Sequence, residues 1–232
     1  MTALTVVFDL DGTLVDTAPD LVAALNHILA REGLPPIGYE TARNMVGRGA
    51  RVLVERGLRA NGRLLPAAEI DRLVRDFIAH YASHIADSSR PFPGVEAVLD
   101  RLDDDGCRLV VCTNKLAWLS VRLLDALGLS ERFGFICGAD TFGVSKPNPQ
   151  VLRRTVSCAG GKLSHTVMIG DSITDIATAR AAGVPVIAVD FGYSETPVTQ
   201  LKPDRVISCF ADLPEAVFGL VQPPANEIPR NL

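Results

Sequence analysis

The chain lacks an apolar run of membrane-spanning length and lacks an excess of basic residues. A transmembrane helix needs about 20 consecutive apolar residues, and binding to a nucleic-acid backbone needs surplus Lys and Arg. Here 23 Lys and Arg stand against 27 Asp and Glu, a formal net charge of −4. The N-terminus also has no basic start ahead of its short apolar stretch, which a secretion signal would require. We therefore expect a cytoplasmic protein that binds neither a membrane nor nucleic acid.

Cysteine is scarce, with five residues in 232, and no two of them form a C-x-x-C pair. An odd number cannot all form disulfides, and a zinc ribbon needs C-x-x-C pairs. We expect all five to be small buried hydrophobic residues. A globular chain of this length buries roughly 70% of its unfolded surface, so folding needs no disulfide or metal. A metal ion, if bound, would serve chemistry.

Five apolar segments of strand length recur along the chain, with helical patterns among them. The expected strands are residues 4–8, 108–112, 135–137, 166–169 and 184–189, and the expected helices are 94–105, 116–127, 148–159 and 173–182. Nearly continuous β-branched strands are typical of a parallel sheet that is buried on both faces. The alternation therefore predicts a doubly wound α/β fold.

About ninety residues separate the first two expected strands and contain only helical patterns, at 18–31, 48–59 and 67–86. Such a segment is too long for a crossover and predicts an inserted helical subdomain. We expect a core of residues 1–16 and 89–220, a helical cap of residues 17–88, and a flexible tail of residues 221–232.

Two carboxylates follow the first expected strand, at Asp9 and Asp11. Ligands of open α/β sheets bind at the carboxyl ends of the strands. Two desolvated carboxylates there require a cation or shared hydrogen bonds to offset their repulsion. Alone, however, Asp11-Gly12 also fits an ordinary turn.

The strand at 166–169 ends in a similar way, with Asp171 and Asp175 at the start of a helix. An oxygen-rich cluster at adjacent strand ends suits Mg²⁺, which favours carboxylates, water and phosphate oxygens. The alternative is that Asp171 caps the helix and Asp175 complements its dipole. Both roles can coexist.

Further polar residues follow the strand at 108–112 and precede the helix at 148–159. Thr113 and Asn114 lie where an anion could be held, although either fits a helix N-cap equally well. Lys146 precedes a rigid Pro147, and its ammonium would suit a phosphoryl group beside aspartates. A solvated surface lysine is the alternative.

Taken in order, these motifs resemble those of the haloacid dehalogenase-like hydrolase superfamily. They are Asp9-x-Asp11-Gly12-Thr13, then Thr113, then Lys146-Pro147, then Gly170-Asp171 with Asp175. The resemblance extends from about residue 5 to residue 210. It implies a Rossmann-like core that binds Mg²⁺, with the helical insert as a small mobile cap.

By this resemblance Asp9 is the nucleophile that forms an aspartyl-phosphate, and Asp11 protonates the leaving oxygen and later activates water. The resemblance places Mg²⁺ on Asp9, on the backbone carbonyl of Asp11 and on Asp171. Thr113 and Asn114 would hold phosphoryl oxygens, with Lys146 as a complementary charge. Asp175 would orient Lys146 or a metal-bound water. Dehalogenases of the superfamily lack the second aspartate, so Asp11 favours phosphate esters.

The insert resembles the cap of bacterial phosphoglycolate phosphatases around residues 45–56. Gly47 and Gly49 would let a cap loop approach the active site. Arg48 or Arg51 would pair with the carboxylate of a small substrate. A solvated helix face, with Arg51 paired to Glu55, explains these arginines equally well.

The sequence as a whole predicts a Mg²⁺-dependent phosphomonoesterase acting on a small phosphorylated metabolite, with 2-phosphoglycolate as the leading substrate. Alternatives within the same fold are a phosphatase or phosphomutase for pyrophosphate or a sugar phosphate. An alternative of another class is a non-catalytic protein that binds a phosphorylated ligand. That alternative predicts a missing nucleophile or lysine, whereas Asp9 and Lys146 are both present.

Overall fold

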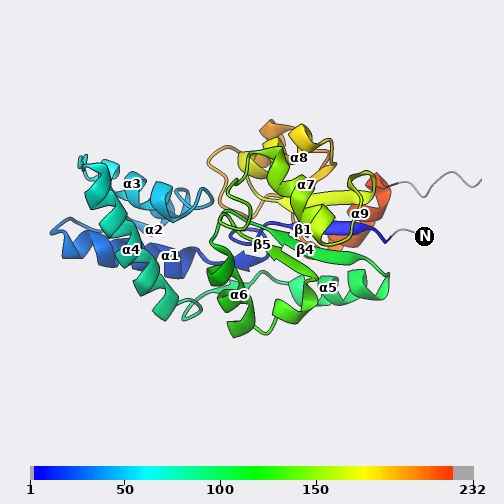
Figure 1. The fold of residues 1–232 in the computed structure, drawn as a ribbon, viewed down its shortest axis with the longest axis horizontal. Helices are drawn as coiled ribbons and strands as arrows, with labels where there is room; N and C mark the ends of the chain where they lie inside the picture. Colours follow the sequence, from blue (N-terminus) through cyan, green and yellow to red (C-terminus); the bar gives the residue numbers. More distant parts are fainter. Residues whose placement is uncertain (1–2, 222–232) are drawn as a thin grey trace, which may run out of the picture.

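The computed structural model describes residues 3–221, which form a six-stranded parallel sheet with helices around it (Figure 1). The strand order is β5 (Phe135–Cys137), β4 (Arg108–Cys112), β1 (Thr5–Phe8), β6 (Thr166–Gly170), β7 (Val186–Val189) and β8 (Arg205–Ile207). The first strand in the chain therefore lies in the middle of the sheet. Its carboxyl end opens between its two neighbours, β4 and β6.

Helices cover both faces of the sheet. Neighbouring residues on a strand point to opposite faces, so each strand contributes side chains to both helical layers. One face of β1 carries Val6 and Phe8, which pack with α5 (Val95–Asp104), α6 (Ala117–Ala126) and α9 (Leu213–Leu220). The other face carries Val7, which packs with α7 (Pro149–Cys158) and α8 (Ile173–Ala182). Because both faces of the central strands are buried, their side chains are almost all apolar.

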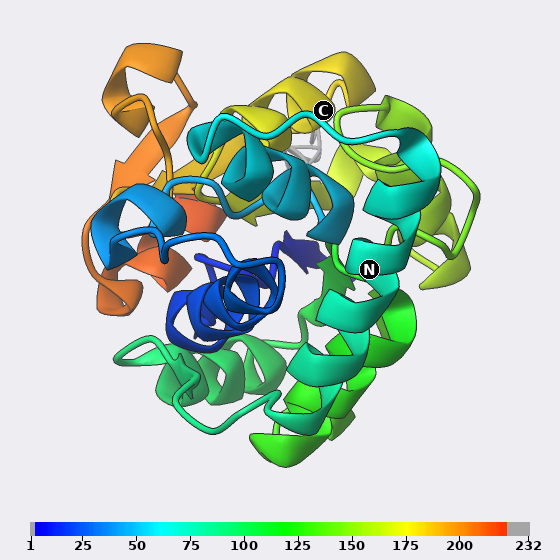
Figure 2. The same ribbon diagram turned by 90° about the vertical axis from the view of Figure 1, so that its left-hand side faces the viewer.

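The four helices between β2 (Val15–Asp16) and β3 (Arg90–Pro91) lie beyond the carboxyl edge of the sheet. They are α1 (Ala18–Arg31), α2 (Tyr39–Arg43), α3 (Ala50–Ala60) and α4 (Ala67–Ser83). In Figure 1 they lie at one end of the molecule, and Figure 2 shows them from that end, in front of the sheet. Helix α4 packs against both α1 and α3. No described helix combines the length and apolarity that crossing a membrane requires.

Two chain segments join these helices to the sheet, and they pair with each other. Val15–Asp16 (β2) and Arg90–Pro91 (β3) form a short antiparallel ladder. Nearby, the carboxylate of Asp20 accepts hydrogen bonds from the backbone N–H groups of Ser88 and Ser89 and from the Ser89 hydroxyl. The entry to the four helices and the exit from them are therefore tied side by side.

The predicted α/β class and all five predicted strands are confirmed; 108–112 and 135–137 match at both ends, and the other three differ by one or two residues at one end. The sequence analysis missed the edge strand β8, the pair β2–β3 and the helices α2 and α9, each of which is short or lies at an end of the pattern. The prediction that all cysteines are buried is wrong for Cys158 and Cys209, which are exposed. The predicted tail, apart from Val221, lies outside the described residues.

Candidate active site

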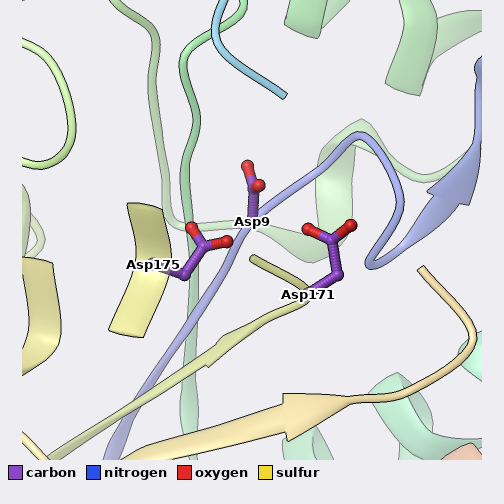
Figure 3. A group of neighbouring side chains, drawn as sticks. All are labelled: Asp9, Asp171 and Asp175. Atoms are coloured by element: carbon purple, nitrogen blue, oxygen red, sulfur yellow. The ribbon is translucent and has the colours of Figure 1, made fainter. Parts of the chain in front are cut away.

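Three buried carboxylates converge at the carboxyl edge of the sheet. Asp9 follows β1, Asp171 follows β6, and Asp175 lies in the first turn of α8. Each offers an oxygen atom within 4.8 Å of the other two. Figure 3 shows the three side chains pointing toward one another from these separate segments.

The register of the sheet brings these residues together. Phe8 and Ile169 are directly paired on β1 and β6, and the Asp9 N–H donates to the Ile169 carbonyl at 2.9 Å. Asp9 therefore lies level with Gly170, the residue before Asp171, so both strands deliver a carboxylate to the same edge of the sheet. Asp175 is fixed separately, because its side chain accepts from the N–H and the hydroxyl of Ser172 in a capping box.

Burial makes this cluster electrostatically costly. Burial raises the pKa of Asp9 to about 7 and outweighs Lys146, which lowers it, while Asp175 and Asp11 add smaller upward contributions. Burial, together with Asp175 and Asp9, likewise raises the pKa of Asp171 well above its usual value. The positive groups of the protein therefore do not fully offset the negative charge of these buried carboxylates.

Among residues 3–221, Lys146 is the one positive charge that forms ion pairs with two of the three carboxylates. Its Nζ lies 2.8 Å from Asp9 Oδ1 and 2.5 Å from Asp175 Oδ1, and the residue is only 4% exposed. Burial alone would lower the pKa of this ammonium, but Asp175 and Asp9 raise it above its usual value. Lys146 therefore stays charged, and the alternative of a surface lysine is wrong.

The backbone of Lys146 is held by the side chain of Asn114. Asn114 Oδ1 accepts from the Lys146 N–H at 3.0 Å, and Asn114 Nδ2 donates to the Lys146 carbonyl at 3.1 Å. Both polar groups of this amide are thus used for positioning. What remains for a ligand is the backbone N–H of Asn114, which donates to no backbone carbonyl within residues 3–221.

Two glycines leave the space that the Asp171 side chain occupies. A Cβ atom added at Gly192 would lie 2.2 Å from Asp171 Cβ, and one added at Gly12 would lie 2.5 Å from Asp171 Oδ2. The N–H of Tyr193 donates to the same carboxylate oxygen at 2.6 Å. The Tyr193 hydroxyl donates to Asp16 at 2.5 Å, so this residue links the carboxylate cluster to β2.

The donor set of this cluster fits a divalent metal ion. Asp9, Asp171 and Asp175 offer only carboxylate oxygens, the ligand type that hard cations such as Mg²⁺ prefer. Their raised pKa values at Asp9 and Asp171 mark a site where a bound cation would offset unfavourable charge. Among residues 3–221, no other group of His, Cys, Asp or Glu side chains is arranged in this way.

Asp11 lies beside this cluster, but its side chain contacts Lys115 and Thr17 instead of the other carboxylates. Its Oδ1 accepts from Lys115 Nζ at 2.8 Å and from Thr17 Oγ1 at 2.8 Å, and Oδ2 lies 3.2 Å from the same Nζ. The Asp11 side chain thus faces Lys115, while its neighbour Gly12 turns the chain at a φ of 83°.

A cavity of about 270 Å³ lies between the carboxyl edge of the sheet and the four helices. Asp11, Asn114 and Lys115 line it from the sheet side, and Arg48 and Tyr81 line it from the helices. Most of the remaining lining is apolar, including Leu21, Val46, Leu53, Phe77 and Leu119. A binding site of roughly 300 to 1,000 Å³ accommodates drug-sized ligands, so this cavity suits a smaller molecule.

The predicted cap residues differ in their surroundings. Gly47, with a φ of 102°, and Arg48 line this cavity and also a neighbouring hollow beside Ser172 and Tyr193. Arg51 also lines the cavity, but its guanidinium is paired with Asp71 and Glu55. The predicted pairing of Arg51 with Glu55 is confirmed.

Two capping alternatives from the sequence are wrong. Helix α6 has Leu116 at its N-cap, so neither Thr113 nor Asn114 caps it, and α8 begins after Ser172 rather than after Asp171. Thr113 is buried beside the site, with its Oγ1 accepting from the Lys115 N–H at 3.2 Å.

Sequence reasoning missed Lys115, Tyr193 and Thr17. A lysine directly after the predicted anion-binding Thr113 and Asn114 was a usable signal for the first of these. Tyr193 reaches Asp171 across 22 positions, a contact with no local sequence pattern. Thr17 was read only as part of the boundary of the insert.

An open parallel sheet with buried carboxylates at its carboxyl edge and a small cavity above them is the architecture of an α/β enzyme. The family model of haloacid dehalogenase-like hydrolases matches residues 6–189, and the chain belongs to this family. It is therefore a hydrolase with the fold that its sequence motifs indicated.

Relatives cover nearly the whole chain. A phosphoglycolate phosphatase of Caulobacter vibrioides is 53% identical over 217 residues, which is 94% of this chain and 92% of the relative. One of Agrobacterium fabrum is 47% identical over 212 residues, 91% of each chain. A solved structure from Haemophilus somnus, described as a predicted phosphoglycolate phosphatase, superposes with a TM-score of 0.87 at 30% identity. It covers 93% of this chain and 98% of that one.

Proposed function

We propose that the chain is a phosphoric monoester hydrolase that converts 2-phosphoglycolate into glycolate and phosphate in the cytoplasm. The observation that carries this proposal is the buried cluster of Asp9, Asp171 and Asp175 with Lys146 bonded into it. Relatives named phosphoglycolate phosphatase at up to 53% identity support the choice of substrate. The small cavity beside the cluster suits a metabolite of this size.

Mg²⁺ is the cofactor that the carboxylate cluster favours. Asp9 and Asp171, with the backbone carbonyl of Asp11, would hold it, and Asp175 would remain the partner of Lys146. When bound, the cation would offset the repulsion between the phosphoryl oxygens and the carboxylate nucleophile. Its positive charge would also stabilise the buried carboxylates of Asp9 and Asp171 in their charged form.

Asp9 is the proposed nucleophile. Its carboxylate attacks phosphorus while the bond from phosphorus to the ester oxygen breaks, giving an aspartyl-phosphate. Asp11 supplies the proton that the departing oxygen needs, and glycolate leaves. In the second half Asp11 takes a proton from water, whose oxygen attacks phosphorus and restores the Asp9 carboxylate.

The groups around Asp9 are suited to hold the transferred phosphoryl group. The Thr113 hydroxyl accepts from the Lys115 N–H and retains its own proton for a phosphoryl oxygen. The Asn114 N–H is a second donor, and the Lys146 ammonium supplies positive charge at the nucleophile. Phosphoryl transfer depends mainly on such positioning and charge compensation.

Residues 17–88 are proposed to act as the cap, above a core of residues 1–16 and 89–220. The paired segments β2 and β3 and the contacts of Asp20 with Ser88 and Ser89 support a joint at this place. In this proposal Gly47 and Arg48 close over the substrate, and Arg51 contributes less because Asp71 and Glu55 already pair with it.

The test is phosphate release from 2-phosphoglycolate with Mg²⁺, beside pyrophosphate and a panel of sugar phosphates. We expect selective hydrolysis of 2-phosphoglycolate, lost with EDTA and in Asp9→Asn. Preference for another phosphate would overturn the substrate and the role of the cap. Transfer of phosphate to a second substrate hydroxyl would indicate a mutase. No turnover of any compound, together with ligand binding that Asp9→Asn leaves unchanged, would indicate a binding protein.

A further inference from the structure

Lys115 is a buried charge that the proposed mechanism does not use. Its side chain is 5% exposed, and its Nζ lies 2.8 Å and 3.2 Å from the two oxygens of Asp11. The ring of Tyr81, which comes from α4, faces the same ammonium at 4.6 Å from its centroid. Buried ion pairs contribute little net stability because both charges lose their hydration. A role in stability is therefore a weak explanation for this pair.

The contacts of Asp11 conflict with its proposed work as an acid. Thr17 Oγ1 and Lys115 Nζ each lie 2.8 Å from Asp11 Oδ1, and the same Nζ lies 3.2 Å from Oδ2. Both oxygens of the Asp11 carboxylate are therefore occupied. A carboxylate whose two oxygens are both held by Lys115 is not free to contact a leaving oxygen. Before Asp11 can act, the Lys115 ammonium must find another anionic partner.

The cavity shows where that partner would enter. Lys115 and Asp11 line it together, under the apolar side chains of the four helices. Of the other cations on its wall, Arg48 is exposed and Arg51 is paired with carboxylates of its own helices. Lys115 is therefore the buried cation that a second anionic group of the substrate would meet.

Tyr81 keeps the ammonium available on this side. A cation over an aromatic face is attracted to the ring without being neutralised by it. The Tyr81 hydroxyl is buried and has no hydrogen-bond partner among the described residues. Burial raises the pKa of this phenol to about 12, so it remains a neutral donor on the wall of the cavity.

We propose that Lys115 determines specificity by exchanging its partner: the carboxylate of the substrate takes the Lys115 ammonium from Asp11, which frees Asp11 for proton transfer. The inference rests on the proposed function and names its substrate class, phosphate monoesters with a second anionic group close to the ester oxygen. The exchange moves an ammonium between two carboxylates and breaks no covalent bond. An ester without the second anion leaves Asp11 bound to Lys115 and reacts slowly.

The test compares 2-phosphoglycolate with phosphoglycolamide, its amide, which has nearly the same shape but no second negative charge. The wild type is expected to prefer the acid by roughly 100-fold in kcat/KM, the scale of a specific buried contact with a charged group. Equal hydrolysis of the two esters by the wild type would overturn the proposal without any variant.

Lys115→Met is expected to lower kcat/KM for the acid by roughly 100-fold and to raise kcat for the amide severalfold, because Asp11 is released. Lys115→Arg keeps the charge and should retain part of the preference. Lys162→Met removes an exposed lysine away from the site and serves as the matched control. Thermal unfolding of each variant reports whether it is folded.

The outcomes separate this inference from the function on which it rests. If Lys115→Met lowers turnover of both esters by the same factor, Lys115 only supports the site and the inference fails while the function stands. If Lys115→Met changes neither ester, the inference fails as well. If the wild type hydrolyses neither ester when it is folded and Mg²⁺ is present, the proposed function is wrong. The inference is then wrong as well, because it depends on that function.

Discussion

The two sides of the candidate site hold their charged groups in opposite ways. On the sheet side, Asp9 and Lys146 are each 4% exposed and are bonded to groups from other strands or loops. On the helix side, Arg48 is exposed, and Arg51 is almost half exposed and bonded to residues of α3 and α4. On the sheet side, strand register fixes Asp9 and the Asn114 side chain fixes the backbone of Lys146. Arg48 and Arg51, in contrast, are exposed at the ends of long side chains.

This difference indicates how the work of the site is divided. Groups whose positions depend on the backbone of a buried sheet are preorganised, which is what the chemical step requires. Groups at the ends of flexible side chains can adapt to a ligand and select it. Variants on the sheet side should therefore affect kcat most, and variants on the helix side should affect KM.

Asp9→Asn should have the largest effect. An amide cannot act as the nucleophile, and loss of a covalent nucleophile lowers kcat by a factor on the order of 10⁴ to 10⁶. The unfolding temperature should stay the same or rise, because the variant removes a carboxylate whose burial is unfavourable. Single-turnover assays and thermal unfolding measure the two effects, and Asp103→Asn, an exposed aspartate of α5, is the matched control. Substantial residual turnover would place the nucleophile elsewhere.

Lys146→Met should lower kcat by roughly 10² to 10³-fold, with a smaller change in KM, because the lost charge acts on the reacting phosphoryl group. Asn114→Ala removes only the two bonds to the Lys146 backbone, so its effect should be smaller, roughly tenfold. Steady-state kinetics below the unfolding temperature of each variant measure both. A larger effect from Asn114→Ala than from Lys146→Met would contradict this order.

Mg²⁺ should raise the unfolding temperature of the wild type. At about 100 times its Kd, a ligand adds about 2.7 kcal/mol to the free energy of unfolding, which corresponds to roughly 5 to 10 °C for a chain of this size. Asp171→Asn should abolish most of this shift while the metal-free variant unfolds no earlier than the metal-free wild type. NaCl at equal ionic strength is the control. An unchanged shift in Asp171→Asn would remove Asp171 from the metal site.

The sequence allowed the sheet side to be predicted far better than the helix side. Asp9 and Asp171 each follow a recognisable apolar strand, and parallel strands must end at the same edge of a sheet. Their meeting, and the confirmed family membership, follow from local patterns that are visible in the chain. Strand register is set by the same apolar residues that identify the strands.

The remaining features depend on contacts between distant segments. Lys115 reaches Asp11 across 104 positions, and Tyr81 reaches Lys115 from a helix whose position over the sheet no periodicity specifies. The pairing of Arg51 with Asp71 likewise depends on how α3 packs against α4. Side-chain partners of this kind follow from tertiary packing, so a sequence pattern indicates that such residues are present but not which partners they choose.

Variants of Arg48 and Arg51 should have the smallest effects, but they test most sharply whether the helix side acts on KM and the sheet side on kcat. Both are arginines of the same segment and both line the cavity, but only Arg51 already has two carboxylate partners in this structure. Arg48→Met should therefore raise KM for 2-phosphoglycolate by roughly tenfold, the value of one charged hydrogen bond, with kcat changed less than threefold. Arg51→Met should change KM less than threefold, because exposed ion pairs contribute little.

If Arg51→Met has the larger effect on KM, the helices must rearrange when substrate binds, with Arg51 leaving Asp71 for the ligand. If either variant lowers kcat as strongly as Lys146→Met does, the helix side takes part in the chemical step and the division fails.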